Sequence, residues 1–201
     1  MDDLNGFNEL NGLVKKMRTV TFLLTVLCLI LATTSGAQGA MVFSVDFAQD
    51  GVFEDTFSLR PGESVSVDIY VSNVPAPGLR AVGFKLTYDA SKLQVIQEGT
   101  GIDPGNWLGN SAEFDTPGEI QMAGFKLGEG LSGDSIKLGT VQFQYVSSGA
   151  SEIRLLDRGE TVDGFVLTDG TVLDGDLLDG VLLGRFVPVF NPGVIMLLLD
   201  E

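Results

Sequence analysis

Hydrophobic and polar residues alternate most regularly between residues 78 and 95. Four apolar or aromatic residues occupy every second position in the first half of this segment, namely Val82, Phe84, Leu86 and Tyr88. A period of two is typical of a β-strand with one buried face. Turn-forming residues 89–91 interrupt the pattern, and residues 92–95 resume it. The pattern therefore predicts a strand, a tight turn and a second strand.

Shorter runs of the same kind predict the other strands. An alternation over residues 65–71 precedes the central pair, and Gly, Asp and Pro punctuate the rest of the chain. Further strands are expected at residues 42–47, 52–59, 119–126, 138–146, 153–155, 165–167 and 181–183. Residues 99–118 are expected to be irregular. Since no helical period of 3.6 is sustained after residue 40, the pattern predicts an all-β, antiparallel β-sandwich of about nine strands.

The first 40 residues have the pattern of a helical signal peptide. A basic segment, residues 15–18, precedes an apolar run over residues 20–31, and small residues follow. Cleavage is expected near Ala37 or Ala40, and Met17 is an alternative start of the chain. The apolar run is shorter than the ~20 residues of a comfortable membrane crossing, so we expect an exported protein rather than an anchored one.

The exported part divides into a sandwich over residues 41–184 and a tail over residues 185–201. The tail contains a second apolar run, residues 194–199, which ends in two acidic residues and is too short to cross a membrane. It weakly resembles the start of a C-terminal sorting signal of bacteria. A truncated sorting signal, a last strand and an exposed tail are the alternatives.

Charge and missing residue types exclude several functions. The formal charge is −15, from 12 basic and 27 acidic residues. The segment up to Arg18 carries three of each sign, so the remainder carries 9 basic and 24 acidic residues, and it would repel nucleic acids. The sequence has no His, and its single cysteine, Cys28, lies in the predicted leader. Catalysis by Ser-His-Asp or Cys-His and ordinary zinc sites are therefore excluded.

Acidic residues near the end of the chain raise the question of calcium. Four Asp-Gly pairs occur between residues 157 and 180, and they begin at Asp163, Asp169, Asp174 and Asp179. Calcium binds carboxylate and carbonyl oxygens, but the spacing does not match a calcium-binding loop. Asp-Gly is a frequent turn dipeptide, so turns are the better interpretation. No cofactor is expected on this chain, and no enzymatic activity.

The central segment also resembles a known family. Its elements are a strand, Asn73-Val74-Pro75, then Gly78-Leu79, then an alternating strand that ends in Tyr88-Asp89-x-Ser91-x-Leu93-x-Val95. This order is similar to that of cohesin domains, and the resemblance extends from about Phe43 to about Leu183. It implies a jelly-roll β-sandwich that binds a dockerin-like protein module without catalysis. Calcium is then possible, on the partner in preference to this chain.

The resemblance also implies a binding face. On the strand before Tyr88, cohesins carry outward Asn and Asp residues that contact the partner, and the matching positions here are Ala81 and Gly83. Lys85 and Thr87 share their outward parity. Because neither Ala81 nor Gly83 has a polar side chain, we expect a partner specificity that differs from that of well-known cohesins.

The main alternative is a carbohydrate-binding module of the same group of folds. Trp107, the single Trp of the chain, lies between Gly105 and Gly109. It could offer a ring to a polysaccharide or a cell-surface glycan, or it could anchor its loop at the edge of the core. Under both interpretations the protein is secreted or displayed on a bacterial cell surface.

Overall fold

The computed structural model describes residues 40–157, 164–173 and 180–189. Within these ranges the chain forms two β-sheets and no helix. Residues 1–39 of the predicted leader, with the cleavage position at Ala37 and the start at Met17, lie outside the described residues, as do residues 190–201 of the tail. Ala40, the other expected cleavage position, is the first described residue. No described segment is a helix that could cross a membrane.

The first sheet has four strands in the order β1-β3-β9-β5. These strands are β1 (Val42–Phe47), β3 (Ser64–Ser72), β9 (Ile136–Tyr145) and β5 (Leu93–Ile102). All neighbours in this sheet are antiparallel.

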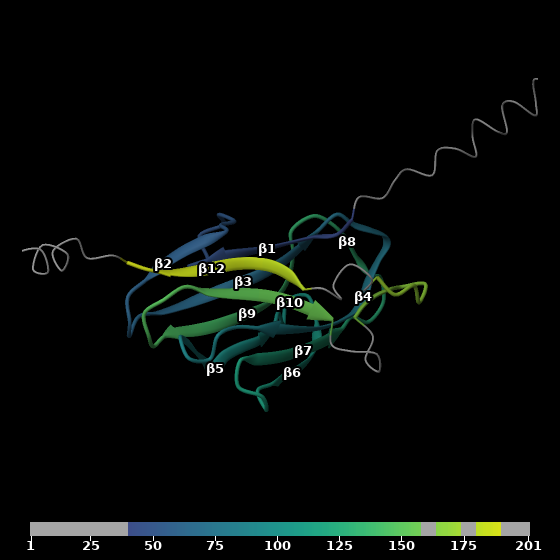
Figure 1. The fold of residues 1–201 in the computed structure, drawn as a ribbon. Helices are drawn as coiled ribbons and strands as arrows, with labels where there is room; N and C mark the ends of the chain where they lie inside the picture. The colour runs from purple at the N-terminus through teal and green to yellow at the C-terminus, as the bar shows by residue number, and fades with distance from the viewer. Residues whose placement is uncertain (1–39, 158–163, 174–179, 190–201) are drawn as a thin grey trace, which may run out of the picture. The chain divides into compact units, whose positions relative to one another are not determined.

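The second sheet has the order β2-β12-β10-β4-β7-β6 (Figure 1). Its strands are β2 (Thr56–Leu59), β12 (Val181–Pro188), β10 (Ser151–Asp157), β4 (Val74–Thr87), β7 (Glu119–Phe125) and β6 (Leu108–Glu113). Two short strands, β8 (Leu131–Gly133) and β11 (Phe165–Leu167), also pair with β4. Pairing is antiparallel except between β2 and β12, which run parallel. The predicted all-β sandwich is confirmed.

The core lies between the two sheets, because the apolar side chains of both sheets point into this space. On β4 the side chains of Val82, Phe84 and Leu86 are at most 2% exposed. Aromatic rings join the sheets: Phe186 of β12 lies edge-on to Phe143 of β9, with ring centroids 5.7 Å apart. Burial of these rings and aliphatic side chains is the main stabilising term of the fold.

The predicted strand, tight turn and second strand are present as β4, a turn at residues 90–92, and β5. β4 belongs to the second sheet and β5 to the first, so the turn between them carries the chain across the sandwich. The Asp89 carbonyl accepts hydrogen bonds from the backbone N–H groups of Lys92 (3.0 Å) and Leu93 (2.9 Å). An alternating pattern shows which face of a strand is buried, and strands in opposite sheets bury their faces against the same core.

The sandwich extends past the expected boundary at residue 184. Strand β12 continues to Pro188, and the Phe186 side chain is completely buried. The backbone N–H of Val189 still donates to the Leu59 carbonyl (3.1 Å). The aromatic and aliphatic residues at the start of the expected tail are therefore part of the second sheet.

A buried carboxylate lies on the outer side of the first sheet. Asp68 is 5% exposed and accepts hydrogen bonds from Lys137 Nζ (2.6 Å), Thr140 Oγ1 (2.7 Å) and Gln49 Nε2 (2.7 Å). Burial tends to raise the pKa of Asp68, but the hydrogen bonds from Lys137, Thr140 and Gln49 together outweigh it and lower the pKa below 3.8. The charged form of Asp68 is thus favoured by folding.

Asp68→Asn is expected to lower the free energy of unfolding by about 1–3 kcal/mol near neutral pH, because an amide leaves donors unsatisfied. A lowered carboxylate pKa contributes stability above the unfolded pKa, and this contribution is lost as the pH falls through the folded pKa. The gap between wild type and variant should therefore narrow below pH 3.8. Urea denaturation at about pH 7 and about pH 3 measures the difference in unfolding free energy between wild type and Asp68→Asn. A gap of equal size at both pH values would contradict this account, and Asp55→Asn, at an exposed carboxylate, is the control.

Candidate functional site

The positions of β4 that face away from the core lie at the centre of the second sheet. Ala81, Lys85 and Thr87 are partly exposed there, whereas Gly83 is buried. The N–H of Gly83 donates to the Gly164 carbonyl (2.8 Å). We call the side of strands β12, β10, β4, β7 and β6 that points away from the core the outer face. It contains all four of the predicted partner-binding positions, with Gly83 contributing little surface.

An apolar row crosses the strands at one end of the outer face. The strand register places Ala81 opposite Phe125, and Phe125 opposite Leu108. On the other side of Ala81 lies Val166 of β11, which is bridged to Val172. We call these five residues the apolar row. Three of them are large and well exposed: Leu108 (47%), Phe125 (48%) and Val172 (42%).

The next row along the strands has small residues. Gly83 of β4 lies opposite Ala123 of β7. Neither residue has a side chain beyond Cβ. The apolar row is therefore bordered by a stretch of the outer face where the backbone lies nearest to the surface.

The following rows are polar. Lys85 lies opposite Gln121 of β7 and Leu156 of β10, and Thr87 lies opposite Glu119. Lys85 Nζ is 3.2 Å from Glu119 Oε2, with both side chains partly exposed. Such a surface ion pair contributes at most about 1 kcal/mol to stability, so its main effect is to fix the charges on this part of the face.

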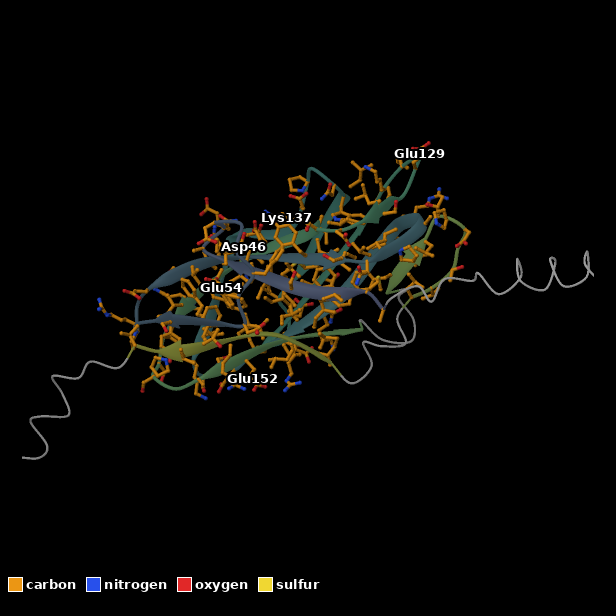
Figure 2. The ribbon with its side chains drawn as sticks, turned by 90° about the horizontal axis from the view of Figure 1, so that it is seen from above. Asp46, Glu54, Glu129, Lys137 and Glu152 are labelled. Atoms are coloured by element: carbon orange, nitrogen blue, oxygen red, sulfur yellow. The ribbon has the colours of Figure 1, made fainter. Side chains whose placement is uncertain are left out.

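Two arginines share one carboxylate at the far end of the outer face. Glu152 accepts hydrogen bonds from Arg185 Nη2 (2.6 Å) and from Arg154 Nη2 (2.8 Å). The hydrogen bond from Arg185, followed by that from Arg154, lowers the pKa of Glu152. Figure 2 shows Glu152 and Lys137 on opposite sides of the sandwich, as their places on the two sheets require. The outer face thus changes from apolar at the row of Ala81 to charged at Glu152.

Trp107 does not form a platform for a sugar. Its side chain is 2% exposed, and Nε1 donates to the Lys137 carbonyl (2.9 Å). Asn106 Nδ2 donates to the same carbonyl (3.1 Å), and the Trp107 N–H donates to the Asp103 carbonyl (2.9 Å). The expected glycan contact at Trp107 is corrected accordingly: the indole anchors its loop on the core, because burial satisfies both its apolar ring and its single N–H.

One of the four Asp-Gly pairs, Asp169-Gly170, lies fully within the described residues. In residues 40–157, 164–173 and 180–189, no three His, Cys, Asp or Glu side chains gather so that they could hold a metal ion. Asp169-Gly170 forms a turn: Asp169 Oδ1 accepts from the Thr171 N–H (2.9 Å), and Gly170 has a φ of +87°. The residues Asp163, Asp174 and Asp179 lie outside the described part of the chain.

Sequence reasoning did not find the apolar row. Leu108 belongs to β6, which lies in the stretch that was expected to be irregular because it is rich in Gly, Asn and Pro. Phe125 continues the outward parity of β7, and this was a usable signal. The alignment of Val172, Val166 and Ala81 depends on pairing between distant segments, which the alternation of one strand does not reveal.

A β-sandwich with a partly apolar outer face has the features of a binding module. Residues 53–177 match the family model of the cohesin domain. This match covers more than half of the chain, and the chain therefore belongs to the cohesin domain family. Cohesin domains are non-catalytic binding modules, so the predicted resemblance and the predicted absence of catalysis agree with the family.

Solved cohesins have the same fold. One is the sixth cohesin of scaffoldin B from Acetivibrio cellulolyticus, in complex with a mutant Cel5 dockerin; it is 20% identical, with a TM-score of 0.52, and the match covers 75% of this chain and 99% of that one. The OlpA cohesin of Clostridium thermocellum, in a type I complex with a dockerin, is 15% identical, with a TM-score of 0.54 and coverage of 75% and 100%.

A third solved cohesin is a module of a glycoside hydrolase. The cohesin module of a family 33 glycoside hydrolase from Clostridium perfringens is 13% identical, with a TM-score of 0.53 and coverage of 75% and 97%. At these identities the similarity establishes the fold. None of the curated proteins compared with the chain matches it.

Proposed function

We propose that this chain is an exported module that binds a dockerin-like protein through the outer face and so attaches it within an extracellular, polysaccharide-related assembly. The strand that carries Ala81, Gly83, Lys85 and Thr87 is the centre of the contact. The observation that carries the proposal is the apolar row, in which exposed Val172, Phe125 and Leu108 lie on one line across the sheet.

Exposed apolar residues that adjoin one another are a common mark of a protein-binding surface. Single exposed hydrophobic residues are ordinary, but here the strand register places five apolar residues side by side. Beyond the small residues Gly83 and Ala123, polar and charged rows follow on one side, as the rim of an interface surrounds its core. A contact of ordinary size, about 800 Å² on each partner, would cover the apolar row and the row of Lys85 together.

A polysaccharide is the second candidate, with less support. The resemblance to carbohydrate-binding modules suggested it through Trp107, whose ring is buried. A polysaccharide ligand would need other aromatic faces, such as the exposed Phe53, whose ring lies edge-on to Tyr70 at 5.3 Å on the first sheet. This pair lies on the opposite sheet from the proposed contact, so the two candidates can be separated by surface substitutions.

Ala81→Arg is expected to reduce capture of the protein partner by at least about tenfold, because a guanidinium placed in the apolar row would have to be desolvated. The test uses the full chain as bait on proteins secreted by the source organism, with and without EDTA, and identifies captured proteins by mass spectrometry. A captured protein with paired calcium loops, lost on chelation, supports the proposal.

Gln94→Arg is the matched control, because Gln94 is exposed on β5 of the other sheet. It should leave capture unchanged. If Ala81→Arg captures the same proteins in the same amounts as wild type, the outer face is not the contact. If only polysaccharide is retained, the dockerin-type function is wrong.

A further inference from the structure

A pocket lies at the edge of the sandwich, between β5 of the first sheet and the connection from β6 to β7 of the second. Its volume is about 290 Å³, close to the lower end of the range of small-ligand sites. Leu93 in its lining is buried, whereas Val146 is exposed. The pocket is therefore open to solvent, and its size suits a small ligand rather than a protein domain.

Two aromatic side chains provide much of the apolar lining. Tyr88 follows β4 and Phe114 follows β6, and both are partly buried and pack against the core. The Tyr88 ring lies edge-on to Phe143, with ring centroids 5.4 Å apart. These contacts hold the two rings in place before a ligand arrives, which lowers the entropic cost of binding.

The connection from β6 to β7 is fixed against the backbone of Tyr88. The Tyr88 N–H donates to the Gly118 carbonyl (2.9 Å), and the Glu119 N–H donates to the Thr116 carbonyl (3.0 Å). Gly118 has a φ of +84°, and a Cβ there would lie 2.9 Å from the Tyr88 carbonyl oxygen. A tight turn thus positions Pro117, another residue of the lining.

The polar part of the lining is neutral. Among the described residues, those that line the pocket include no Asp, Glu, Lys or Arg, although the whole chain has 27 acidic residues. The polar side chains are those of Tyr88 and of two exposed glutamines, Gln94 and Gln97. Burial raises the pKa of Tyr88, so its hydroxyl is uncharged near neutral pH.

The charges that adjoin the lining along the chain are acidic. Glu98 follows Gln97, and Asp115 follows Phe114. An anionic ligand would be repelled by these carboxylates, and a cationic ligand would find no carboxylate in the lining itself. The matching ligand is therefore neutral and has both apolar faces and hydrogen-bonding groups.

A pyranose sugar has this combination of groups. Its C–H groups form faces that can lie on aromatic rings, and its hydroxyls can exchange hydrogen bonds with side-chain amides. A proline-rich peptide also binds aromatic surfaces, but it extends along a groove. We propose that this pocket binds one pyranose unit of a neutral oligosaccharide, with Tyr88 and Phe114 against its faces and Gln94 and Gln97 at its hydroxyls.

This sugar site is additional to the proposed protein contact. Seven residues of extended chain lead from Ala81 in the apolar row to Tyr88, which is about 23 Å at ~3.3 Å per residue. The chain can thus hold a protein partner and a sugar at the same time, and each site can be removed without the other.

The test titrates the full chain with cellotetraose, xylotetraose and mannotetraose by isothermal titration calorimetry, with trigalacturonate and decaproline as the acidic and peptide comparisons. At least one neutral sugar should bind with a Kd below about 1 mM. Phe114→Ala should weaken its binding by at least about tenfold. Gln97→Ala, at an exposed position, should weaken it about threefold to tenfold through the loss of one hydrogen bond.

Phe53→Ala is the matched control, because Phe53 is also an exposed aromatic (48%) but lies against Tyr70, outside the lining of the pocket. Phe53→Ala and Ala81→Arg should each change the sugar affinity by no more than about twofold. Far-UV circular dichroism checks that Phe114→Ala is folded, and if it is not, Gln97→Ala decides.

Three results would overturn the sugar site. The first is that none of the neutral sugars binds at about 1 mM. The second is that trigalacturonate or decaproline binds more tightly than every neutral sugar. The third is that binding is lost in Phe53→Ala but kept in Gln97→Ala. None of them affects the proposed protein contact, which Ala81→Arg tests separately.

Discussion

Replacing Gly78 by alanine is expected to lower the free energy of unfolding by about 3 kcal/mol, since both backbone strain and overlap oppose it. Gly78 has a φ of +93°, a conformation that residues with a Cβ rarely adopt. A Cβ at this position would lie 2.7 Å from the carbonyl carbon of Gly130 and 2.9 Å from its oxygen. These are backbone atoms, so the contact cannot be relieved by rotating a side chain. The carbonyl of Gly78 also accepts from the Thr168 N–H (2.9 Å), which ties a third segment to the same place.

The variant Gly62→Ala separates the effect of backbone strain from the effect of steric overlap. Gly62 has the same φ of +93°, but nothing lies within 4 Å of its would-be Cβ. This variant should lose only the strain, about 1–2 kcal/mol. Urea denaturation followed by Trp107 fluorescence measures both variants, because the single Trp is buried in the native state. Equal losses of unfolding free energy in Gly78→Ala and Gly62→Ala would show that overlap between the added Cβ and Gly130 costs nothing.

Trp107→Ala is expected to lower the free energy of unfolding by about 3–5 kcal/mol, the usual range for removing a large buried aromatic side chain. The substitution also removes the indole N–H donor of the Lys137 carbonyl. Loss of the ring should therefore loosen the segment that leads into β6, at the Leu108 end of the apolar row.

Far-UV circular dichroism in urea measures this loss, because the variant has no Trp to report fluorescence. Phe53→Ala is the control: Phe53 is 48% exposed, and its removal should cost no more than about 1 kcal/mol. A Trp107→Ala variant as stable as wild type, with an altered affinity for polysaccharide, would restore the glycan interpretation of this residue.

The strands were predictable from the sequence because their signal is local. Val82, Phe84 and Leu86 repeat every second residue, and all three point into the core. The same signal found β1 and β11 with the bounds that the structure has. Strand β6 escaped it because its central residues, Gly109 to Ser111, are small or polar, and β-propensity reflects packing more than backbone preference.

The site was predictable only in part. Outward parity placed Ala81, Lys85 and Thr87 on the outer face, since it follows from the pleat alone. Parity did not show that Gly83 would be buried, because the residues beside it come from distant segments such as Gly164. Nor could it show that Leu108 and Val172 end the same row, since register between strands is fixed by the assembled core.

Buried polar contacts and the end of the domain were beyond sequence reasoning for a similar reason. Asp68, Lys137 and Gln49 come from three separate segments, and nothing near Asp68 in the sequence distinguishes it from the many surface carboxylates. Phe186 looked like part of an apolar tail, whereas its partners Phe47 and Phe143 are more than 40 residues away in the sequence.

The edges of the two sheets affect how many copies of this module could stand close together. Strand β2 has four residues, and β5 departs from its ladder with β9 between Ile96 and Gly101, over the sequence Gln-Glu-Gly-Thr. Short, irregular and polar edge strands are poor templates for pairing with another chain. In an assembly that concentrates such modules side by side, these two edges would thus resist pairing between neighbouring modules.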